Sequence, residues 1–327
     1  MCNLYDLSWE ETIIEKKIKV GSMFAGIGGI DLAFVQAGCE VVWANEKDRY
    51  ACETYRLNLG DAFLVEDDIR NIRTKDIPEF DILTAGFPCQ AFSSVGLLRG
   101  FDDPRGNMFF EIVRVIKDVK TRVVFLENVA NLLRHDGGGT FKVMKNVLEK
   151  LGYEVLFRVM NAKDYGNLPQ QRNRIYIVAF RMKNDLLGFK YPGAIPLTRT
   201  AFDLYDKEHQ DDRYYMDGHR MWDSMMVYMT ERDRVYRFTD WGISRGQVGI
   251  CPTLLAAMGS RYERIPFFYD DYSVRLMTPR ECARMQGFSK KFILPESNEK
   301  QVYKQIGNSV AVPVVYRIAR NILKIFE

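Results

Sequence analysis

The sequence predicts an α/β fold in which a mostly parallel sheet carries helices on both faces. From residue 18 to 151, short apolar runs of strand length alternate with segments whose apolar residues recur at helical spacing. Past residue 151, two strand-like runs follow one another with no helix between them, so we expect them to pair antiparallel and to close the sheet. The alternation stops near residue 188, which indicates a second, smaller domain.

Size and composition limit the classes of protein to consider. The chain has 327 residues, of which 47% are hydrophobic, enough for one large domain and a smaller one. Its apolar runs are shorter than the roughly 20 residues that span a bilayer, and acidic residues stand where a signal peptide would be basic and then apolar. We therefore expect a cytoplasmic protein without a membrane segment. The six cysteines form no CxxC pair and the three histidines lack metal-ligand spacing, which favours an organic cofactor over a metal.

The first strand, expected at residues 18–23, leads into a glycine-rich turn and then a helix. Gly26, Gly28 and Gly29 allow the backbone to approach a ligand closely. Asp31 stands where a nicotinamide-binding loop, GxGxxG, would have its third glycine. The loop therefore indicates a bound ligand but not a nicotinamide.

The next two strands, expected at residues 40–44 and 62–65, each end in acidic residues. Glu46 follows the glycine loop by about 20 residues, where an acid holds ribose hydroxyls in nucleotide-binding folds. Glu66, Asp67 and Asp68 follow the third strand, and an aspartate there could accept a hydrogen bond from an adenine amino group. Each acid equally suits a helix cap or a solvated surface. Together with the loop, they predict a nucleoside-containing cofactor.

The fourth strand, expected at residues 82–85, breaks at Gly86 and places Cys89 just past its carboxyl end. Ligands collect at that edge of an open α/β sheet, so Cys89 is a candidate nucleophile. The alternative is a buried structural thiol, the common state of free cysteine. The fifth strand, expected at residues 121–126, delivers Glu127 beside Cys89, where a partly desolvated carboxyl can donate a proton.

The strands expected at residues 153–160 and 174–180 are separated only by residues 161–173. A parallel sheet closed by such an antiparallel hairpin is typical of nucleoside-methionine methyltransferases and not of nicotinamide dehydrogenases. Past it, residues 191–237 show no clear periodicity, and residues 238–272 have the composition of loops.

Two helices are expected near the carboxyl terminus. One begins after Thr278, a suitable cap, with Pro279 in its first turn; the other spans residues 312–325. We expect a catalytic and cofactor-binding domain at 1–188 completed by 303–327, a second, smaller domain at 189–272 and a connecting segment at 273–302. Residues 232–304 hold 13 Lys or Arg against 8 Asp or Glu, a local charge of +5. This excess suits a phosphate backbone as well as an ordinary solvated surface.

The order of the motifs resembles that of bacterial DNA (cytosine-5)-methyltransferases of the restriction–modification type. The motifs are FAGIGG, NE, DDI, GFPCQAFS, DDPRGNMFF, ENV, QQRNR, RLMTPRECARMQGF and QIGNSVAVP, within residues 19–181 and 271–322. The resemblance implies a class I S-adenosylmethionine-dependent methyltransferase fold, with a Rossmann-like mixed seven-stranded sheet and a smaller DNA-recognition domain. It implies S-adenosyl-L-methionine as cofactor and double-stranded DNA as substrate. A cognate restriction endonuclease would act on the same site without direct contact, and a monomer is expected.

The resemblance also assigns roles to residues. Cys89 becomes the nucleophile that adds to carbon 6 of a flipped cytosine. Glu127 faces the pyrimidine N3 and amino group, Arg174 faces the carbonyl oxygen, and Arg172 supports them. The cofactor-binding residues are Phe24, Ala25, Gly26, Ile27, Gly28, Gly29, Glu46, Asp68, Ile69, Pro88, Asn308, Ser309 and Val310. The candidates for DNA contact are Ser93, Arg245, Arg261 and Arg264. Lys47 stands where the family commonly has an aromatic residue, which leaves one adenine face less covered.

Three alternatives remain from the sequence. A tRNA cytosine-5 methyltransferase would share the scaffold, but residues 181–272 form an insertion where DNA enzymes carry their recognition module. A catalytically silent DNA-binding protein would not need Cys89, Glu127 and Arg174. A dehydrogenase conflicts with the glycine loop and with the closing hairpin.

Overall fold

The computed structural model describes residues 17–87 and 108–327, and these form two compact units. The larger unit contains residues 17–87, 108–160, 173–192 and 315–327, and the smaller unit contains residues 161–172 and 193–314. Two segments that we expected in the catalytic domain, 161–172 and 303–314, belong to the smaller unit, as does the expected connecting segment. Gln170 forms a β-bridge with Cys251 of the smaller unit, and the Gln286 side chain donates to the Ile306 carbonyl oxygen, so contacts distant in sequence place these segments there.

The larger unit is built on a seven-stranded sheet with the order β3-β2-β1-β4-β5-β7-β6. The strands are β1 (Lys19–Met23), β2 (Glu40–Glu46), β3 (Leu64–Glu66), β4 (Ile82–Gly86), β5 (Val123–Val129), β6 (Glu154–Asn161) and β7 (Asn173–Phe180). β1 pairs in parallel with β2 and β4, and β4 pairs in parallel with β5. β7 runs antiparallel to β5 and lies between β5 and β6. The predicted mixed seven-stranded sheet is thereby confirmed.

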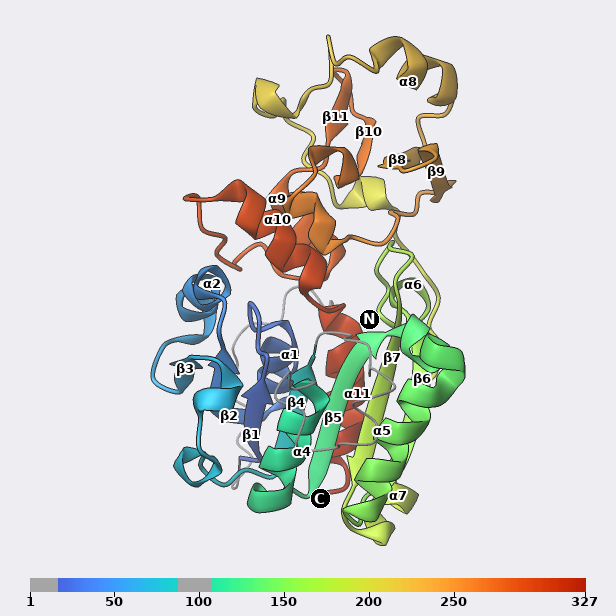
Figure 1. The fold of residues 1–327 in the computed structure, drawn as a ribbon. Helices are drawn as coiled ribbons and strands as arrows, with labels where there is room; N and C mark the ends of the chain where they lie inside the picture. Colours follow the sequence, from blue (N-terminus) through green and yellow to red (C-terminus); the bar gives the residue numbers. More distant parts are fainter. Residues whose placement is uncertain (1–16, 88–107) are drawn as a thin grey trace. The chain divides into compact units, whose positions relative to one another are not determined.

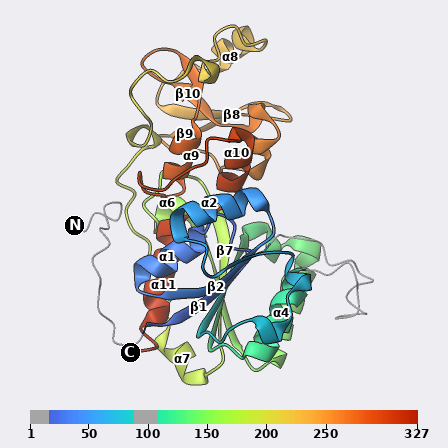
Figure 2. The same cartoon turned by 90° about the vertical axis from the view of Figure 1, so that its left-hand side faces the viewer.

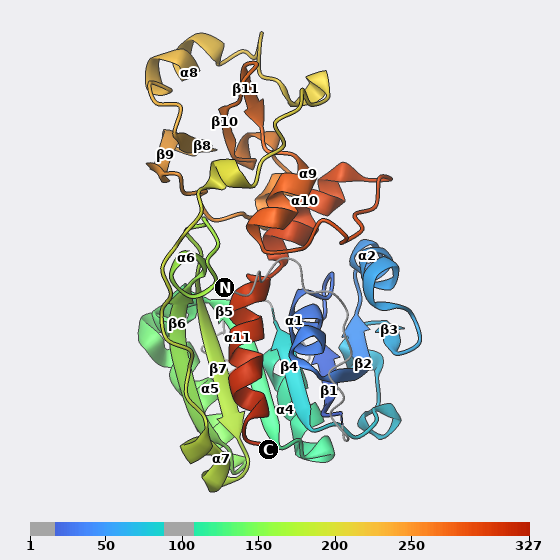
Figure 3. The same cartoon turned by 180° about the vertical axis from the view of Figure 1, so that it is seen from behind.

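Helices cover both faces of this sheet. They are α1 (Gly29–Ala37), α2 (Arg49–Leu59), α4 (Met108–Val119), α5 (Gly139–Lys150), α7 (Lys183–Gly188) and α11 (Val312–Leu323), with 3-10 turns η1 (Ile69–Asn71), η2 (Thr74–Asp76), η4 (Ala130–Leu133) and η5 (His135–Gly138). α4 and α5 lie over one face of the sheet (Figure 1). α1 lies over the other face, together with the part of α11 that belongs to this unit (Figure 3). The view along the sheet shows the same two layers of helices (Figure 2).

The burial pattern explains why these segments form these elements. β4 and β5 are central strands with helices on both faces, and their apolar runs are buried almost throughout. In α4, Phe109, Ile112, Val113 and Ile116 recur at helical spacing and are at most 1% exposed. α2 begins after Asp48, whose side chain accepts a hydrogen bond from the Tyr50 amide.

The fifth strand differs from its prediction. It was expected to end before Glu127, but β5 includes Glu127 and continues to Val129, because β7 pairs with it as far as Val129. Glu127 is therefore held by a strand on each side rather than carried on a loop.

Asp31, the residue that replaces the third glycine, is completely buried in the larger unit. Its carboxylate accepts hydrogen bonds from the hydroxyl groups of Ser22, at 2.6 Å, and Tyr55, at 2.7 Å. Burial raises the pKa of Asp31 to about 6, and the two hydrogen bonds reduce that rise. The carboxyl thus joins β1, α1 and α2 beneath the glycine loop.

The pH dependence of stability should reveal this carboxyl. The folded protein binds the Asp31 proton more tightly than the unfolded chain, whose aspartate has its ordinary pKa near 3.8. The free energy of unfolding should therefore lose about 3 kcal/mol from this group as the pH rises from about 4 to about 6. Asp31→Asn should remove that component. Urea unfolding of both proteins across this pH range measures the component. If the free energy of unfolding changed with pH in the same way for both proteins, the raised pKa would not belong to Asp31.

The smaller unit contains a four-stranded sheet with the order β11-β10-β8-β9. Its elements are α6 (Ala162–Tyr165), α8 (Trp222–Tyr228), β8 (Arg234–Thr239), β9 (Gly242–Val248), β10 (Phe267–Tyr269), β11 (Val274–Leu276), α9 (Pro279–Met285) and α10 (Glu299–Asn308), with 3-10 turns η6 (Ala201–Asp203), η7 (Asp212–Tyr214), η8 (Ala256–Gly259) and η9 (Tyr262–Arg264). The loop interpretation of residues 238–272 was wrong. β10 and β11 have three residues each, too short to show a period of two, and β8 pairs with β9 across a register shift.

The helix predicted after Thr278 is confirmed as α9. The Thr278 side chain accepts from the Glu281 amide, and the Glu281 carboxylate accepts from the Thr278 amide, which makes a capping box with Pro279 in the first turn.

Arg275 is the buried centre of this unit. Its fully buried guanidinium donates to the carboxylates of Asp270 and Glu281, each at 2.7 Å, and to the carbonyl oxygens of Asp206 and Leu276. It also lies over the Phe268 ring, 4.6 Å from its centroid. One side chain therefore connects β10, β11, α9 and the backbone at Asp206.

Replacing Arg275 with methionine should leave two buried carboxylates without a cation. We expect the free energy of unfolding to fall by about 3–5 kcal/mol, the usual cost of breaking a buried ion pair. Arg73→Met is the matched control, because Arg73 forms an exposed pair with Asp76, and such pairs contribute about 0–1 kcal/mol. Denaturant unfolding compares the two, and equal losses would contradict the role given to Arg275.

No helix among residues 17–87 and 108–327 has the length and apolar character needed to cross a membrane.

Candidate active site

The carboxyl ends of the parallel strands β4 and β5 lie side by side at one edge of the sheet and carry Glu127 there. The strands are parallel, and Gly86, the last residue of β4, lies opposite Glu127. Pro88, Cys89 and Ser93 follow directly, but all three lie outside the described residues. The Asn128 side chain donates to the Phe87 carbonyl oxygen at 2.9 Å, which fixes the chain two residues before Cys89. Asn128 belongs to the ENV motif, but no local pattern indicates this role for it.

Glu127 and Arg174 meet across β5 and β7. Arg174 lies opposite Val129, and Glu127 is two residues before Val129, so the two side chains project from the same face of the sheet. The Arg174 Nε lies 3.0 Å from Oε1 of Glu127, and the side chains are only 13% and 9% exposed. Shielding from water strengthens the attraction between the two charges. The structure thus brings together two of the predicted catalytic residues.

The glycine loop and Glu46 form a second cluster at the ends of β1 and β2. Phe24 and Gly26 have φ angles of 56° and 58°, which turn the chain sharply after β1. The Glu46 carboxylate accepts hydrogen bonds from the Gly26 amide at 2.9 Å and from the Lys47 and Asp48 amides at 2.8 Å. A carboxylate has about four acceptor positions, so Glu46 keeps capacity for a ligand hydroxyl. A side chain at Gly26 would meet no atom within 4 Å, so the loop leaves open space at this point.

Asp68 lies at the end of β3 in a cluster of charges. Arg70 donates to both of its carboxylate oxygens, at 2.8 and 2.6 Å, and the Lys47 ammonium lies 3.3 Å away. The hydrogen bonds from Arg70 are the main cause that holds the Asp68 pKa below its usual range. Lys47, noted for replacing an aromatic residue, therefore adds a second cation beside the predicted adenine-binding acid, which Arg70 already pairs.

Sequence reasoning missed the residue that anchors this turn. Arg114 on α4 donates to the carbonyl oxygens of Ile69, at 2.8 Å, and Ile72, at 2.9 Å, and so fixes η1 beside Asp68. The sequence MFFEIVRVIKDV of α4 has other charged residues, so Arg114 carries no local signal that distinguishes it.

Arg172 belongs to the smaller unit and is 2% exposed. Its guanidinium donates to the carbonyl oxygens of Leu254 at 2.9 Å, Gly307 at 3.2 Å, and Ser309. It therefore holds in place the backbone of the segment that contains Asn308, Ser309 and Val310. Ser309 and Val310 are buried, whereas Asn308 is exposed.

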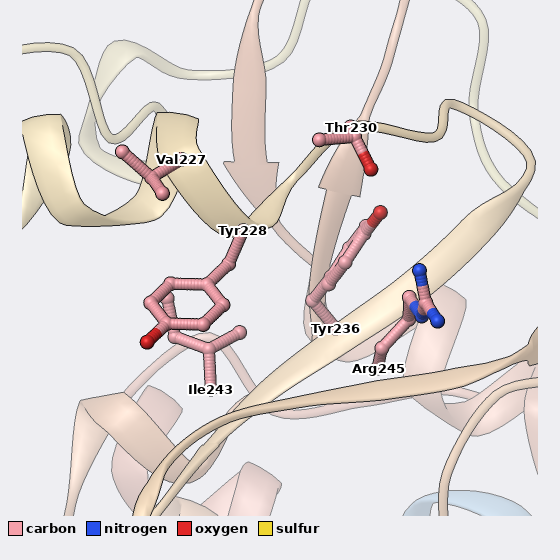
Figure 4. A pocket seen from close by; sticks show the side chains of 6 residues that line it. All are labelled: Val227, Tyr228, Thr230, Tyr236, Ile243 and Arg245. Atoms are coloured by element: carbon pink, nitrogen blue, oxygen red, sulfur yellow. The ribbon is translucent and has the colours of Figure 1, made fainter.

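The three arginines predicted to contact DNA all lie in the smaller unit and have acidic partners. Arg261 and Arg264 both contact Asp240 beyond the end of β8; Arg261 is 64% exposed but Arg264 only 16%. Arg245, on β9, is 54% exposed and lies 2.7 Å from Glu231. It lines a pocket formed by side chains from β8, β9 and the end of α8 (Figure 4).

The remaining cysteines of the described part of the chain are poor nucleophiles. Cys39, Cys52, Cys251 and Cys282 are buried. Burial raises the pKa of the Cys39 and Cys52 thiols to about 12 and raises those of Cys251 and Cys282 as well.

Comparison with known families gives a match over almost the whole chain. Residues 18–324 match the family described as C-5 cytosine-specific DNA methylase. The type II methyltransferase M.Bsp6I of Bacillus sp. (strain RFL6) is 45% identical over 312 residues, 94% of this chain and 99% of the relative. The type II methyltransferase M.HhaI of Haemophilus parahaemolyticus is 38% identical over 313 residues, 92% of each chain.

Solved structures share the fold. DNMT2 of Spodoptera frugiperda, solved as a mutant, has a TM-score of 0.74 and 18% identity, covering 95% of this chain and 100% of that one. Dnmt2 of S. pombe has a TM-score of 0.73 and 21% identity, covering 94% of this chain and 98% of that one.

Proposed function

The chain belongs to the family of C-5 cytosine-specific DNA methylases, and we propose how its own residues transfer a methyl group to carbon 5 of cytosine in duplex DNA. This membership confirms the resemblance predicted from the motifs. It makes the chain a DNA (cytosine-5)-methyltransferase that uses S-adenosyl-L-methionine. The observation that carries the proposal is the Glu127–Arg174 pair, which lies at the sheet edge that β4 shares with β5.

Cys89 is the proposed nucleophile. Carbon 5 of cytosine is a weak nucleophile, so the ring must be activated before it can accept a methyl group. The Cys89 thiolate adds to carbon 6, and the electron pair of the 5,6 double bond becomes available at carbon 5. S-adenosyl-L-methionine supplies the methyl group from its sulfonium. A base then removes the proton from carbon 5, the double bond forms again, and the thiolate leaves.

Glu127 and Arg174 stabilise the charge that develops in the ring. We propose that the Glu127 carboxyl faces N3 and the amino group and donates a hydrogen bond or proton as Cys89 adds. Arg174 holds the carbonyl oxygen while its Nε remains close to Glu127. Arg172 remains a proposed supporting residue, and within its own unit it holds the backbone at Leu254 and Gly307.

The glycine loop, Glu46 and the Asp68 turn suit a nucleoside-containing cofactor. We propose that the backbone of residues 24–29 holds the methionine end and that Glu46 accepts from the ribose. Asp68 and Ile69 would contact the adenine edge. Asp68 would then accept a hydrogen bond from the adenine amino group in place of its contact with Arg70 or Lys47. Pro88 and the 308–310 segment remain proposed contributors to the same binding site.

The substrate must leave the duplex to react. A stacked cytosine cannot reach a thiol and a carboxyl at the end of a sheet, so the base has to be everted. We propose that the smaller unit selects the sequence, with Arg245, Arg261, Arg264 and Ser93 as contacts, and that the enzyme acts as a monomer in the cytoplasm. Type II methyltransferases among its relatives support a cognate restriction endonuclease that cuts the same site. The same relatives favour DNA over tRNA as the substrate.

Cys89→Ser should abolish methyl transfer, because a serine hydroxyl is rarely ionised near neutral pH, while binding of duplex DNA should remain largely intact. Bisulfite sequencing of DNA from cells that express each protein measures transfer and also identifies the methylated sequence. Cys39→Ser is the control thiol, since Cys39 is buried away from the proposed site. Full methylation by the Cys89 variant would refute the mechanism.

Glu127→Gln should lower turnover by about 10²–10⁴-fold, as for loss of a general acid, because glutamine keeps the shape but cannot donate the proton. Single-turnover assays with labelled S-adenosyl-L-methionine separate this effect from product release. Glu149→Gln serves as control, because Glu149 forms an exposed pair with Lys145 on α5. Unchanged turnover in the Glu127 variant would remove this carboxyl from the chemistry.

A further inference from the structure

Asp31 is a buried carboxylate that has no cation beside it. It is completely buried in the larger unit, and its hydrogen-bond donors are the hydroxyl groups of Ser22 and Tyr55. Among residues 17–87 and 108–327, no lysine, arginine or histidine lies within ion-pair distance of it. Burial raises the pKa of Asp31 to about 6, so the carboxyl is ionised at neutral pH. A buried charge is costly unless an opposite charge compensates it.

The other buried acidic side chains in the described part of the chain are compensated in this way. Each of them pairs with an arginine: Glu127 with Arg174, Asp185 with Arg122, and both Asp270 and Glu281 with Arg275. Asp31 departs from this rule. A cation that the chain does not itself supply would restore it.

The position of Asp31 indicates where such a cation would lie. Ser22 is two residues before the glycine loop, residues 24–29, and Asp31 is two residues after it, so their hydrogen bond of 2.6 Å joins the two ends of the loop. The Tyr55 hydroxyl donates to the same carboxylate at 2.7 Å. The Tyr55 ring also supports the loop, because a Cβ at Gly28 would lie only 3.1 Å from it. The carboxylate is therefore fixed beneath the backbone proposed to hold the methionine end of the cofactor.

The cofactor changes its charge when it reacts. In S-adenosyl-L-methionine the ammonium and carboxylate groups of the methionine end cancel, and the sulfonium leaves a net charge of plus one. In the product, S-adenosyl-L-homocysteine, the sulfur is a neutral thioether. The two molecules otherwise have almost the same shape, so a nearby fixed charge can distinguish them.

We propose that the Asp31 carboxylate is the counter-charge of the cofactor sulfonium and makes the protein bind S-adenosyl-L-methionine in preference to S-adenosyl-L-homocysteine. The attraction acts across the glycine loop without direct contact, since Asp31 is completely buried. Opposite charges about 10 Å apart, at an effective dielectric constant of about 20, change an affinity about tenfold. The attraction is lost when the methyl group leaves, which favours exchange of product for fresh cofactor. This inference deepens the proposed function and rests on the cofactor site proposed there.

The test compares ligands that differ in charge. Isothermal titration calorimetry at pH 8 measures the Kd of the full chain for S-adenosyl-L-methionine, S-adenosyl-L-homocysteine and sinefungin, in which a protonated amine replaces the sulfonium. Asp31→Asn keeps the shape of the side chain and removes its charge. The Kd values for the two cationic ligands should rise about tenfold, and that for S-adenosyl-L-homocysteine should change less than about twofold.

A purely structural role of Asp31 gives a different result. An acid in the first turn of α1 also interacts favourably with the helix dipole, and this effect does not depend on the charge of the ligand. Equal rises in Kd for all three ligands would therefore overturn the counter-charge. If sinefungin behaved like S-adenosyl-L-homocysteine, the preference would come from contact with the methyl group, and the inference would also fail.

Tyr55→Phe is the matched control, because it removes a hydrogen bond to Asp31 and keeps the charge. At pH 8, about two units above the pKa of Asp31, the carboxyl stays ionised when one hydrogen bond is lost. This variant should keep the wild-type ratio of the Kd values for S-adenosyl-L-methionine and S-adenosyl-L-homocysteine. A ratio changed as much as in Asp31→Asn would mean that the hydrogen bonds and not the charge determine the preference.

The inference and the proposed cofactor site fail differently. Phe24→Ala changes a predicted cofactor-binding residue that carries no charge, so it should weaken binding of all three ligands by the same factor. If it weakens none of them, the proposed cofactor site fails. If it weakens all three but Asp31→Asn keeps the wild-type ratio, only the counter-charge is overturned. Asp31→Asn should be at least as stable as the wild type at pH 8, since it no longer buries a charge, and urea unfolding confirms that it is folded.

Discussion

The contact between Glu127 and Arg174 depends on the direction of one strand. Glu127 lies near the carboxyl end of β5, and Arg174 lies at the start of β7. If β7 ran parallel to β5, its first residues would lie at the opposite edge of the sheet, far from this carboxylate. Because β7 is antiparallel, the beginning of one strand meets the end of the other, and the register places both side chains on one face. The mixed topology is therefore a condition for the site.

Buried arginines perform a similar task in the smaller unit, where regular structure is sparse. Arg275 neutralises two buried carboxylates and also binds carbonyl oxygens, and Arg172 binds three carbonyl oxygens from two separate segments. Each guanidinium donates to buried backbone carbonyl groups, and an unsatisfied buried carbonyl is costly. The long loops of this unit are therefore held by a few side chains, so single substitutions there should have large effects on stability.

Charge alone proved a weak guide to the DNA-binding surface. The sequence showed a local excess of positive charge after residue 232, but the structure pairs Arg245, Arg261 and Arg264 with acids. Arg275 contributes to the count although it is fully buried. Of these three arginines Arg245 alone lines the pocket beside β9, and that property cannot be read from composition.

The sequence by itself determined the alternating strands and helices, the glycine loop and the capped helix after Thr278, because these depend on local periodicity and turn chemistry. It also determined the family, since motifs such as FPCQ, ENV and QxRxR occur in a recognisable order. Only the tertiary structure showed that Glu127 lies within β5, that Arg172 binds backbone carbonyls of its own unit, and that residues 238–272 contain strands. Those features arise from pairing between segments far apart in the chain, and such pairing leaves no local pattern when strands are only three residues long.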